Sequence, residues 1–384
     1  MANLDPASIP PADVAHLRTA ARLAWRGHGR AEPNPLVGCV VTDAEGRRVG
    51  WGFHARCGGP HAEVNALVRA GNAARGGTAY VTLEPCAHTG RTPPCVDALL
   101  RAGIRRVVIG RADPHPRGGG GAEKLRAAGV EIAWATPDSL VLAPAAAFVH
   151  RLRTGRPFVT AKWAQTIDGR IATAAGVSNW ISSERSRRLV HRARGRVDAI
   201  LTGIGTVLTD DPQLTARGVR VRRVARRVVI DPQFRTPMDA QLVVTATQTP
   251  TTIIGWAGDG GGRGERRVAL AAAGVDVIPL GEPGEDVPLD TALRLLVERH
   301  DVTKVLVEGG AGLVGRLFDA DLVNAAWVFV APRLFADDDA VPCARGRRVV
   351  KLAEGIPLRL NGHHVRGGDV LLRYSVASAA AGPS

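Results

Sequence analysis

Apolar and polar positions in the first 150 residues alternate between helical and strand periods. Apolar side chains recur at helical spacing over residues 12–27, which predicts a helix. Apolar runs at 37–42 and 48–53 flank a turn at Asp43–Gly46 and predict a strand hairpin. Further strands and helices follow in alternation, with strands at 79–83, 106–110 and 130–134 and helices at 61–71, 95–102 and 123–128. This alternation predicts a largely parallel sheet covered on both faces.

The second half repeats short apolar strands separated by glycine-rich bends. We predict strands at 158–164, 198–202, 227–230, 251–255, 275–279, 304–307 and 323–331, and helices at 183–194 and 289–299. The stretch 203–212 is expected to be a glycine-rich bend at a strand end.

A domain boundary is expected near residue 150. Residues 148–157 are basic and end in Gly155, Arg156 and Pro157, which is typical of a boundary. We therefore expect a first domain at 1–150, a linker at 151–157 and a second domain at 158–384. Residues 377–384 are expected to be a loose tail.

Length and cysteine content narrow the class of protein. The chain has 384 residues, of which 45% are apolar, and this size suits two globular domains. Five cysteines is a low, odd count, so we expect Cys39, Cys57 and Cys343 to be ordinary thiols in a reducing compartment. The N-terminus has no basic-then-apolar signal pattern, and no apolar run approaches the roughly 20 residues of a membrane helix. A cytoplasmic protein without membrane contact is expected.

The formal net charge of +14 raises the alternative of a nucleic-acid-binding protein. Nearly all the basic residues are Arg, however, and they are spread along the chain instead of forming one patch. Aromatic residues, which stack on bases, make up only 4%. We therefore expect no nucleic-acid partner, and we expect a few Arg side chains to contact a phosphorylated small substrate.

The candidate metal-binding and catalytic residues lie in two segments, one with His61 and Glu63 and one from Cys86 to Cys95. One imidazole and two thiols suit a zinc ion that keeps a fourth position for water. Zinc lowers the pKa of bound water, and a nearby carboxyl such as Glu63 can carry the proton to a leaving amine. The order H-x-E and then P-C is the signature of zinc-dependent deaminases. This chain departs from its short form, because eight residues separate Cys86 from Cys95.

The predicted elements bring these side chains to one edge of the sheet. His61 and Glu63 are two positions apart, so they can converge only at the start of the helix that follows Pro60. Cys86 follows the strand at 79–83, and Cys95 begins the next helix, where the helix dipole favours a thiolate. All three ligands therefore fall beyond the carboxyl ends of strands, where such sheets bind ligands.

A second candidate site follows the strand at 304–307, where Gly310, Gly312 and Gly315 form G-x-G-x-x-G before a predicted helix. Backbone N–H groups at such a helix start can hold a phosphate. The run comes late in its domain, and no acid occupies the following strand at 323–331. We therefore reject a Rossmann fold and keep the phosphate-binding role.

The segments from His61 to Leu67 and from Leu83 to Cys95 resemble the bifunctional riboflavin-biosynthesis deaminase–reductase family. The second half is similar to the reductase domain of that family, and the matching segments are Asp168-Gly169, Ser178–Ile181, Gly205–Arg217, Val229–Asp231 and Glu308–Gly310. The resemblance covers residues 12–375. It implies an α/β protein with a cytidine-deaminase-like three-layer α/β/α domain and then a dihydrofolate-reductase-like α/β domain.

The resemblance also implies site residues. In the first domain His61, Cys86 and Cys95 would hold Zn2+, Glu63 would be catalytic, and the substrate would contact Asn34, His54, His88 and Arg91. In the second domain NADPH would contact Ala164, Trp180, Thr206, Asp210 and the loop Gly310, Ala311, Gly312, Leu313, Val314, Gly315 and Arg316. The reductase substrate would contact Ser178, Arg194, Leu214, Arg217 and Glu308, with the two Arg residues on its phosphate.

The implied function has two steps. The first is zinc-dependent hydrolytic deamination of 2,5-diamino-6-(5-phosphoribosylamino)pyrimidin-4-one. The second is NADPH-dependent reduction of the ribosyl group of 5-amino-6-(5-phosphoribosylamino)uracil to ribityl. Family members often associate through the reductase half, so a homo-oligomer is expected. Two alternatives stay open: a nucleoside or tRNA deaminase fused to an unrelated reductase, and a zinc-stabilised nucleic-acid-binding module.

Overall fold

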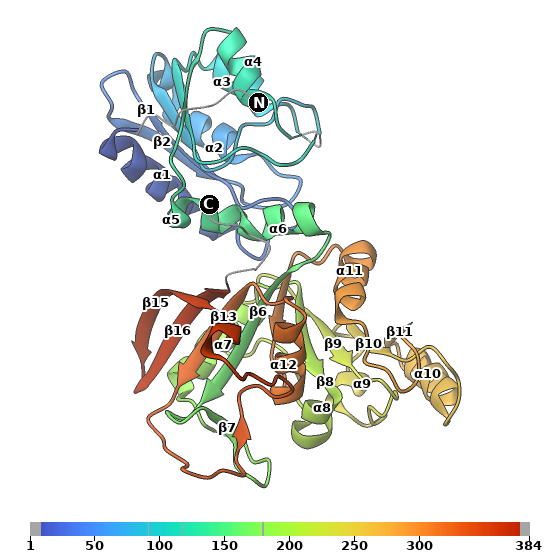
Figure 1. Ribbon diagram of the computed structural model, residues 1–384. Coiled ribbons are helices and arrows are strands. Elements are labelled where there is room, and N and C mark those ends of the chain that lie inside the picture. Colours follow the sequence, from blue (N-terminus) through green and yellow to red (C-terminus); the bar gives the residue numbers. More distant parts are fainter. Residues whose placement is uncertain (1–8, 91, 117, 179, 377–384) are drawn as a thin grey trace. The chain divides into compact units, whose positions relative to one another are not determined.

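The computed structural model describes residues 9–376 apart from Arg91, Arg117 and Asn179. The chain divides into two compact units, 1–155 and 156–384, each with its own sheet and core (Figure 1). The expected tail at 377–384 lies outside the described residues, as do the predicted substrate contact Arg91 and the motif residue Asn179.

The sheet of the first unit runs in the order β2–β1–β3–β4–β5. Its strands are β1 (Gly38–Thr42), β2 (Arg48–Phe53), β3 (Thr78–Val81), β4 (Arg106–Ile109) and β5 (Glu131–Trp134). β3, β4 and β5 are parallel, whereas β1 is antiparallel to both of its neighbours. The predicted hairpin of β1 and β2 is confirmed, whereas the prediction of a largely parallel sheet was wrong for the pairing of β1 with β3. The connection from β2 to β3 passes over β1. The strand β1 therefore lies between two strands that run in the opposite direction.

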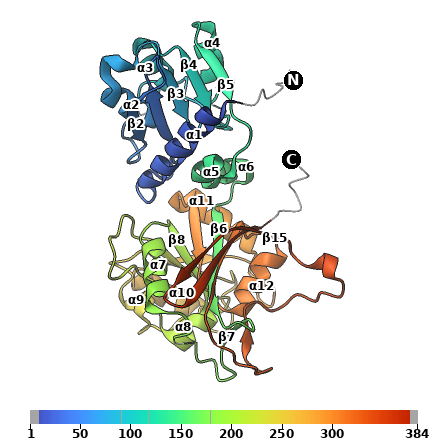
Figure 2. The same cartoon turned by 90° about the vertical axis from the view of Figure 1, so that its left-hand side faces the viewer.

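Helices cover both faces of this sheet (Figure 2). One face packs against α1 (Pro11–Ala24) and α5 (Ser139–Leu142), and the other against α2 (Ala62–Ala70), α3 (Cys95–Arg101) and α4 (Gly121–Ala127). Val40 and Val41 of β1 enter opposite cores, because successive side chains of a strand point to opposite faces. The unit ends with α6 (Ala146–Thr154), so the segment expected as a linker at 151–157 begins inside a helix.

The sheet of the second unit runs in the order β11–β10–β9–β8–β12–β6–β13–β16–β15. Its strands are β6 (Phe158–Gln165), β8 (Ala199–Gly203), β9 (Arg226–Ile230), β10 (Thr251–Gly255), β11 (Asp276–Pro279), β12 (Lys304–Val307), β13 (Ala325–Val330), β15 (Leu358–Arg366) and β16 (Asp369–Val376). In this sheet order, all neighbouring strands from β11 at the edge to β13 are parallel. β16 and β15 then add an antiparallel hairpin. A small separate pair joins β7 (Arg170–Ala172) to β14 (Val341–Pro342).

Two buried clusters occupy the two faces of this sheet. The first includes α11 (Leu289–His300) and α12 (Ala311–Asp319), and the second includes α9 (Gln241–Val244) and Leu270 of α10 (Arg263–Ala272). A helix α7 (Glu184–Arg194) places Val190 against Phe329 and Leu371. Within the described residues, no helix is both long and apolar enough to span a membrane.

The chain reverses its direction of travel across the sheet between β8 and β12. β8 leads through α8 (Ile204–Asp210) to β9 on one side, whereas β12 leads through α12 to β13 on the other side, beyond β6. In open parallel sheets such a reversal opens a crevice at the carboxyl ends of the two strands. The loops after β8 and β12 therefore lie where a ligand is expected.

Several segments differ from the sequence prediction, and three of them show why. Residues 204–210 form the helix α8 instead of a bend, because Val207 is buried at 2% exposure and anchors that turn despite the flanking glycines. α10 was missed because its apolar pattern is weak and buries only Leu270. The hairpin β15–β16 was missed because β15 is exposed along its length and so lacks a buried, alternating face.

Candidate functional site

Three metal-binding side chains meet at the carboxyl edge of the first sheet. His61 is the N-cap residue of α2, Cys86 lies after β3, and Cys95 begins α3. Their ligand atoms all lie within 4.8 Å of one another, with His61 Nδ1 3.1 Å from Cys95 Sγ and 3.5 Å from Cys86 Sγ. One imidazole nitrogen and two sulfurs at this spacing match the donor set of a zinc site with one position left for water.

The two thiols differ in acidity. Hydrogen bonds from the Cys95 thiol, and further from His61 and the Cys95 N–H, lower the pKa of Cys86 to about 4. The same thiol–thiol hydrogen bond and burial raise the pKa of Cys95. The thiolate predicted at Cys95 concerns the zinc-bound site, and it stays a prediction.

Glu63 lies in the first turn of α2, two positions after His61. Its side chain is only 3% exposed, and burial raises the pKa of its carboxyl group, against a smaller opposing effect of His61. A carboxyl group with a raised pKa can both accept and return a proton near neutral pH. Glu63, His61 and Cys86 line one cavity of about 650 Å³, and the Cys95 sulfur lies within 4.8 Å of the other two ligand atoms.

The predicted substrate contacts Asn34, His54 and His88 line this cavity. His54 Nδ1 lies 3.1 Å from the Pro60 carbonyl oxygen, which can only accept, so this nitrogen carries the proton. His54 Nε2 then accepts from the side-chain amide of Asn34 at 3.1 Å. Burial lowers the pKa of His54, which keeps the ring neutral and this tautomer in place. His54 thereby orients Asn34.

Sequence reasoning missed other residues that line the cavity, among them Thr92, Asp113, His115 and Phe148. Thr92 Oγ1 lies 3.4 Å from His61 Nε2. Asp113 follows β4 at the same carboxyl edge as the metal ligands, and this position beyond a parallel strand was the available signal. Burial raises the pKa of Asp113.

A second cavity, of about 700 Å³, lies in the second unit at the carboxyl ends of β6, β8 and β12. All five predicted reductase-substrate residues line it: Ser178, Arg194, Leu214, Arg217 and Glu308. Eight of the predicted NADPH residues also line it: Ala164, Trp180, Thr206, Asp210, Gly310, Ala311, Gly312 and Leu313. An added Cβ at Gly205 or Gly312 would meet no atom within 4 Å, so these backbones border open space that a nucleotide can approach.

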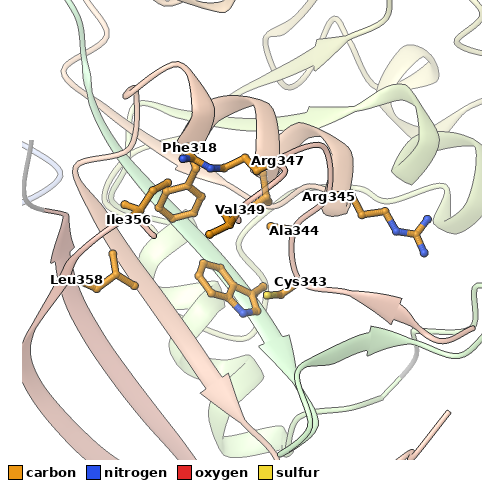
Figure 3. Close-up of a pocket in the computed structure, with 11 residues that line it drawn as sticks. Phe318, Cys343, Ala344, Arg345, Arg347, Val349, Ile356 and Leu358 are labelled. Carbon is orange, nitrogen blue, oxygen red and sulfur yellow. The ribbon is translucent and has the colours of Figure 1, made fainter. Parts of the chain in front are cut away.

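The last three residues of the predicted NADPH loop lie elsewhere. Val314 and Gly315 line a separate apolar cavity of about 280 Å³ with Phe318, Cys343 and Leu358 (Figure 3). Arg316 donates to the Val287 carbonyl at 2.8 Å. The cause is the helix itself, since α12 begins at Ala311 and each later residue lies further from the crevice.

A buried charge network forms one wall of the second cavity. Arg194 donates from Nε to Glu308 Oε1 at 2.6 Å and from Nη2 to Oε2 at 3.0 Å. Lys162 Nζ lies 3.6 Å from Glu308 Oε2. Burial by itself would raise the pKa of Glu308, but Arg194 and Lys162 outweigh it and lower the pKa to about 2. Lys162 was not predicted from the sequence, because a single Lys inside an apolar strand carries no motif.

The loop that carries Leu214 and Arg217 is tied to α7. His191 Nδ1 lies 3.2 Å from both the Thr215 carbonyl oxygen and the Arg217 backbone nitrogen. Arg194 Nη1 donates to the same Thr215 carbonyl at 3.2 Å. The Arg217 side chain donates to Gln213 Oε1 at 2.8 Å. One helix thus supports both the charge network and the loop that carries Leu214 and Arg217.

Comparison with known families matches both units. Residues 11–111 match the cytidine and deoxycytidylate deaminase zinc-binding region, and residues 157–372 match the RibD C-terminal domain. The match to a zinc-binding region agrees with the His and two Cys ligands found at the first site.

Relatives with both halves match nearly the whole chain. The riboflavin biosynthesis protein RibD of Actinobacillus pleuropneumoniae is 39% identical over 95% of this chain and 96% of its own length. RibD of Escherichia coli is 38% identical over 85% of this chain and 89% of its own length.

Solved structures give the same result. A structure of Acinetobacter baumannii RibD superposes with a TM-score of 0.81 at 34% identity, over 95% of this chain and 99% of that one. A diaminohydroxyphosphoribosylaminopyrimidine deaminase/5-amino-6-(5-phosphoribosylamino)uracil reductase from Thermotoga maritima gives a TM-score of 0.81 at 31% identity, with the same coverage.

Proposed function

The chain belongs to the RibD family of bifunctional deaminase–reductases in riboflavin biosynthesis, and on this basis we propose which of its residues perform each step. The open alternatives of an unrelated fused reductase and of a nucleic-acid-binding module are set aside by this membership. Both activities act on small pyrimidines.

For deamination, the proposal assigns His61, Cys86 and Cys95 to zinc and Glu63 to proton transfer. When bound, zinc supplies a water molecule of lowered pKa as the attacking group. Glu63 would carry a proton from the attacking water to the departing amine, so that water and the ring amine would become a ring carbonyl and ammonia. Asn34, held by His54, and His88 orient the pyrimidine. The observation that carries the proposal is the convergence of the three ligand atoms within 4.8 Å beside the buried Glu63.

For reduction, the proposal assigns the second cavity to NADPH and the deaminated pyrimidine. NADPH supplies the hydride. The nucleotide is held by Ala164, Trp180, Thr206, Asp210 and the residues from Gly310 to Leu313. The open space beside Gly205 and Gly312 supports this assignment. Ser178, Leu214 and Arg217 hold the substrate. Arg194 contributes positive charge near its phosphate while it also holds Glu308 ionised.

We further propose a cytoplasmic homo-oligomer that associates through the second unit. No cysteine in the described part of the chain forms a disulfide, which agrees with a reducing compartment. Light scattering of the full chain and of a chain lacking residues 1–155 would test the association.

The variant Glu63→Gln tests the assignment of the deaminase site. It keeps the size and shape of the side chain but cannot carry the proton. We expect ammonia release to fall by at least about 100-fold, with NADPH oxidation on the deaminated intermediate unchanged. Loss of both activities, or of neither, would contradict the assignment.

A further inference from the structure

Trp180 forms part of the wall of the second cavity without being fixed there by burial. It lines the cavity, yet the residue is 66% exposed. Trp side chains in folded proteins are highly buried on average, and close packing against their neighbours then determines their rotamer. An indole at this exposure needs a different contact if it is to keep one orientation.

Arg187 of α7 supplies this contact. Its guanidinium carbon lies 4.3 Å from the centroid of the Trp180 ring, which is the geometry of a cation–π interaction. Arg187 Nη1 donates to the Ser182 carbonyl at 2.5 Å, so the guanidinium is itself held in place over the ring. Arg187 also lines the cavity. The guanidinium therefore covers one face of an indole that still borders the cavity.

The start of α7 is fixed by a carboxylate from β16. Ser183 is the N-cap residue of α7, and its backbone N–H and its hydroxyl both donate to Asp369 Oδ2, at 2.7 and 2.8 Å. Asp369 is only 2% exposed, and a negative charge at a helix N-terminus is stabilising. The backbone N–H of Arg187 then donates to the Ser183 carbonyl at 3.0 Å. Arg187 therefore extends from a helical turn whose position is set by the sheet.

We propose that Arg187 is a positioning residue of the reductase, which holds the Trp180 indole ready to pack against a planar ring of the dinucleotide cofactor. This inference rests on the proposed assignment of the second cavity to NADPH. An indole that is oriented before binding loses less conformational freedom when the cofactor packs against it. Arg187 thus strengthens cofactor binding through Trp180, and not by a contact of its own with the cofactor.

A double-mutant cycle separates these two routes. Titration of NADPH into the zinc-loaded full chain gives the dissociation constant for the wild type, Arg187→Gln, Trp180→Ala and the double variant. We expect Arg187→Gln to weaken NADPH binding roughly 2- to 30-fold, which is the range of a cation–π interaction. In the Trp180→Ala background the same substitution should have almost no effect. Losses that multiply would mean that Arg187 contacts the cofactor directly, and they would overturn the proposal.

Further variants and a second readout exclude a general structural effect. Arg187→Lys keeps a cation beside the indole and should recover part of the lost affinity. Arg188→Gln changes the next residue of α7, which is exposed and is not among the residues that line the cavity, and should bind NADPH as the wild type does. At saturating NADPH, Arg187→Gln should reduce the deaminated pyrimidine with a kcat close to that of the wild type. A lower kcat with unchanged NADPH affinity would contradict the proposal.

The proposal and the cofactor assignment fail in different ways. If Trp180→Ala binds NADPH as tightly as the wild type, the assignment of Trp180 to the cofactor is wrong and the proposal is wrong with it. If Trp180→Ala weakens binding and Arg187→Gln does not, only the role of Arg187 is wrong.

A cofactor fragment identifies the ring that packs against the indole. ADP-ribose with a 2′-phosphate carries the adenine ring and lacks nicotinamide. If Arg187→Gln weakens binding of this fragment as much as binding of NADPH, the adenine packs against Trp180. If only NADPH binding is weakened, the nicotinamide does so. Either result supports the proposal, whereas unchanged binding of both ligands contradicts it.

Discussion

Arg194 and Glu308 form a two-point ion pair inside the reductase cavity, with N–O distances of 2.6 and 3.0 Å. They come from α7 and from the end of β12, which lie 114 positions apart in the chain. Arg194 also donates to the Thr215 carbonyl, so three of its five N–H groups are already occupied. Its guanidinium therefore serves first to hold Glu308 and the substrate loop.

The variant Glu308→Gln should be less stable and inactive as a reductase. It leaves Arg194 and Lys162 without a negative partner, and removal of one member of a buried pair costs about 3–5 kcal/mol. We expect a lower free energy of unfolding in urea at pH 7 and loss of NADPH oxidation, with ammonia release retained. Glu298→Gln, at an exposed position, is the matched control. Equal stability of the two variants would contradict the expected role of the ion pair.

The stabilisation from Glu308 should depend on pH. Its pKa is lowered from 4.5 to about 2 in the folded state, so the unfolded chain takes up the proton first as pH falls. The contribution is therefore fully present above about pH 4.5 and is lost as pH falls towards 2. The difference in unfolding free energy between wild type and Glu308→Gln should be smaller at pH 3 than at pH 7. A larger difference in unfolding free energy at pH 3 than at pH 7 would contradict this prediction.

Arg227 should be essential for the stability of the second unit. It is fully buried, and its guanidinium donates to the Leu242 and Thr249 carbonyls and to the Thr245 and Thr251 hydroxyls. Burial lowers its pKa to about 10. Arg227→Met leaves these acceptors unmatched, and we expect a loss of about 3 kcal/mol or more in urea unfolding. Arg220→Met, at an exposed site, should change stability by less than about 0.5 kcal/mol.

Metal removal should separate the two activities. A chelator that strips zinc should reduce ammonia release by at least about 100-fold, because the attacking water loses its activation. NADPH oxidation on the deaminated pyrimidine should persist, since the reductase cavity is lined by no residue of the metal site. Added zinc should restore ammonia release to the wild type and not to Cys95→Ser. Deamination that survives complete metal removal would contradict the assigned ligands.

Gly38 should not tolerate a side chain. A Cβ there would lie 1.9 Å from the Ala20 carbonyl oxygen of α1, so Gly38→Ala forces the helix away from β1. We expect a cost of about 1–3 kcal/mol in the unfolding of the first unit, measured by denaturation with ammonia release as a second readout. Gly362→Ala, where an added Cβ meets no atom within 4 Å, is the control. Similar stability of both variants would mean that α1 adjusts freely.

The metal site was predictable because local rules place its parts. Pro60 lies just before the N-cap residue of α2, a short apolar strand leads to Cys86, and Pro94 is the N-cap residue of the helix that Cys95 begins. Each ligand needs only its own segment to reach the sheet edge. Of the segment with the G-x-G-x-x-G run, the residues up to Leu313 line the second cavity, whereas the direction of α12 turns Val314 and Gly315 towards the other cavity.

Local periodicity and motif spacing were enough to identify the strands of the first sheet, the parallel strands of the second sheet, the three ligands and the carboxyl edges that carry the sites. Fold and packing decided the antiparallel placement of β1 against β3 and the meeting of Lys162, Arg194 and Glu308. Those features depend on contacts between residues that are distant in the chain. No local pattern encodes them, because the partner that shifts a pKa or neutralises a charge arrives only when the core is packed.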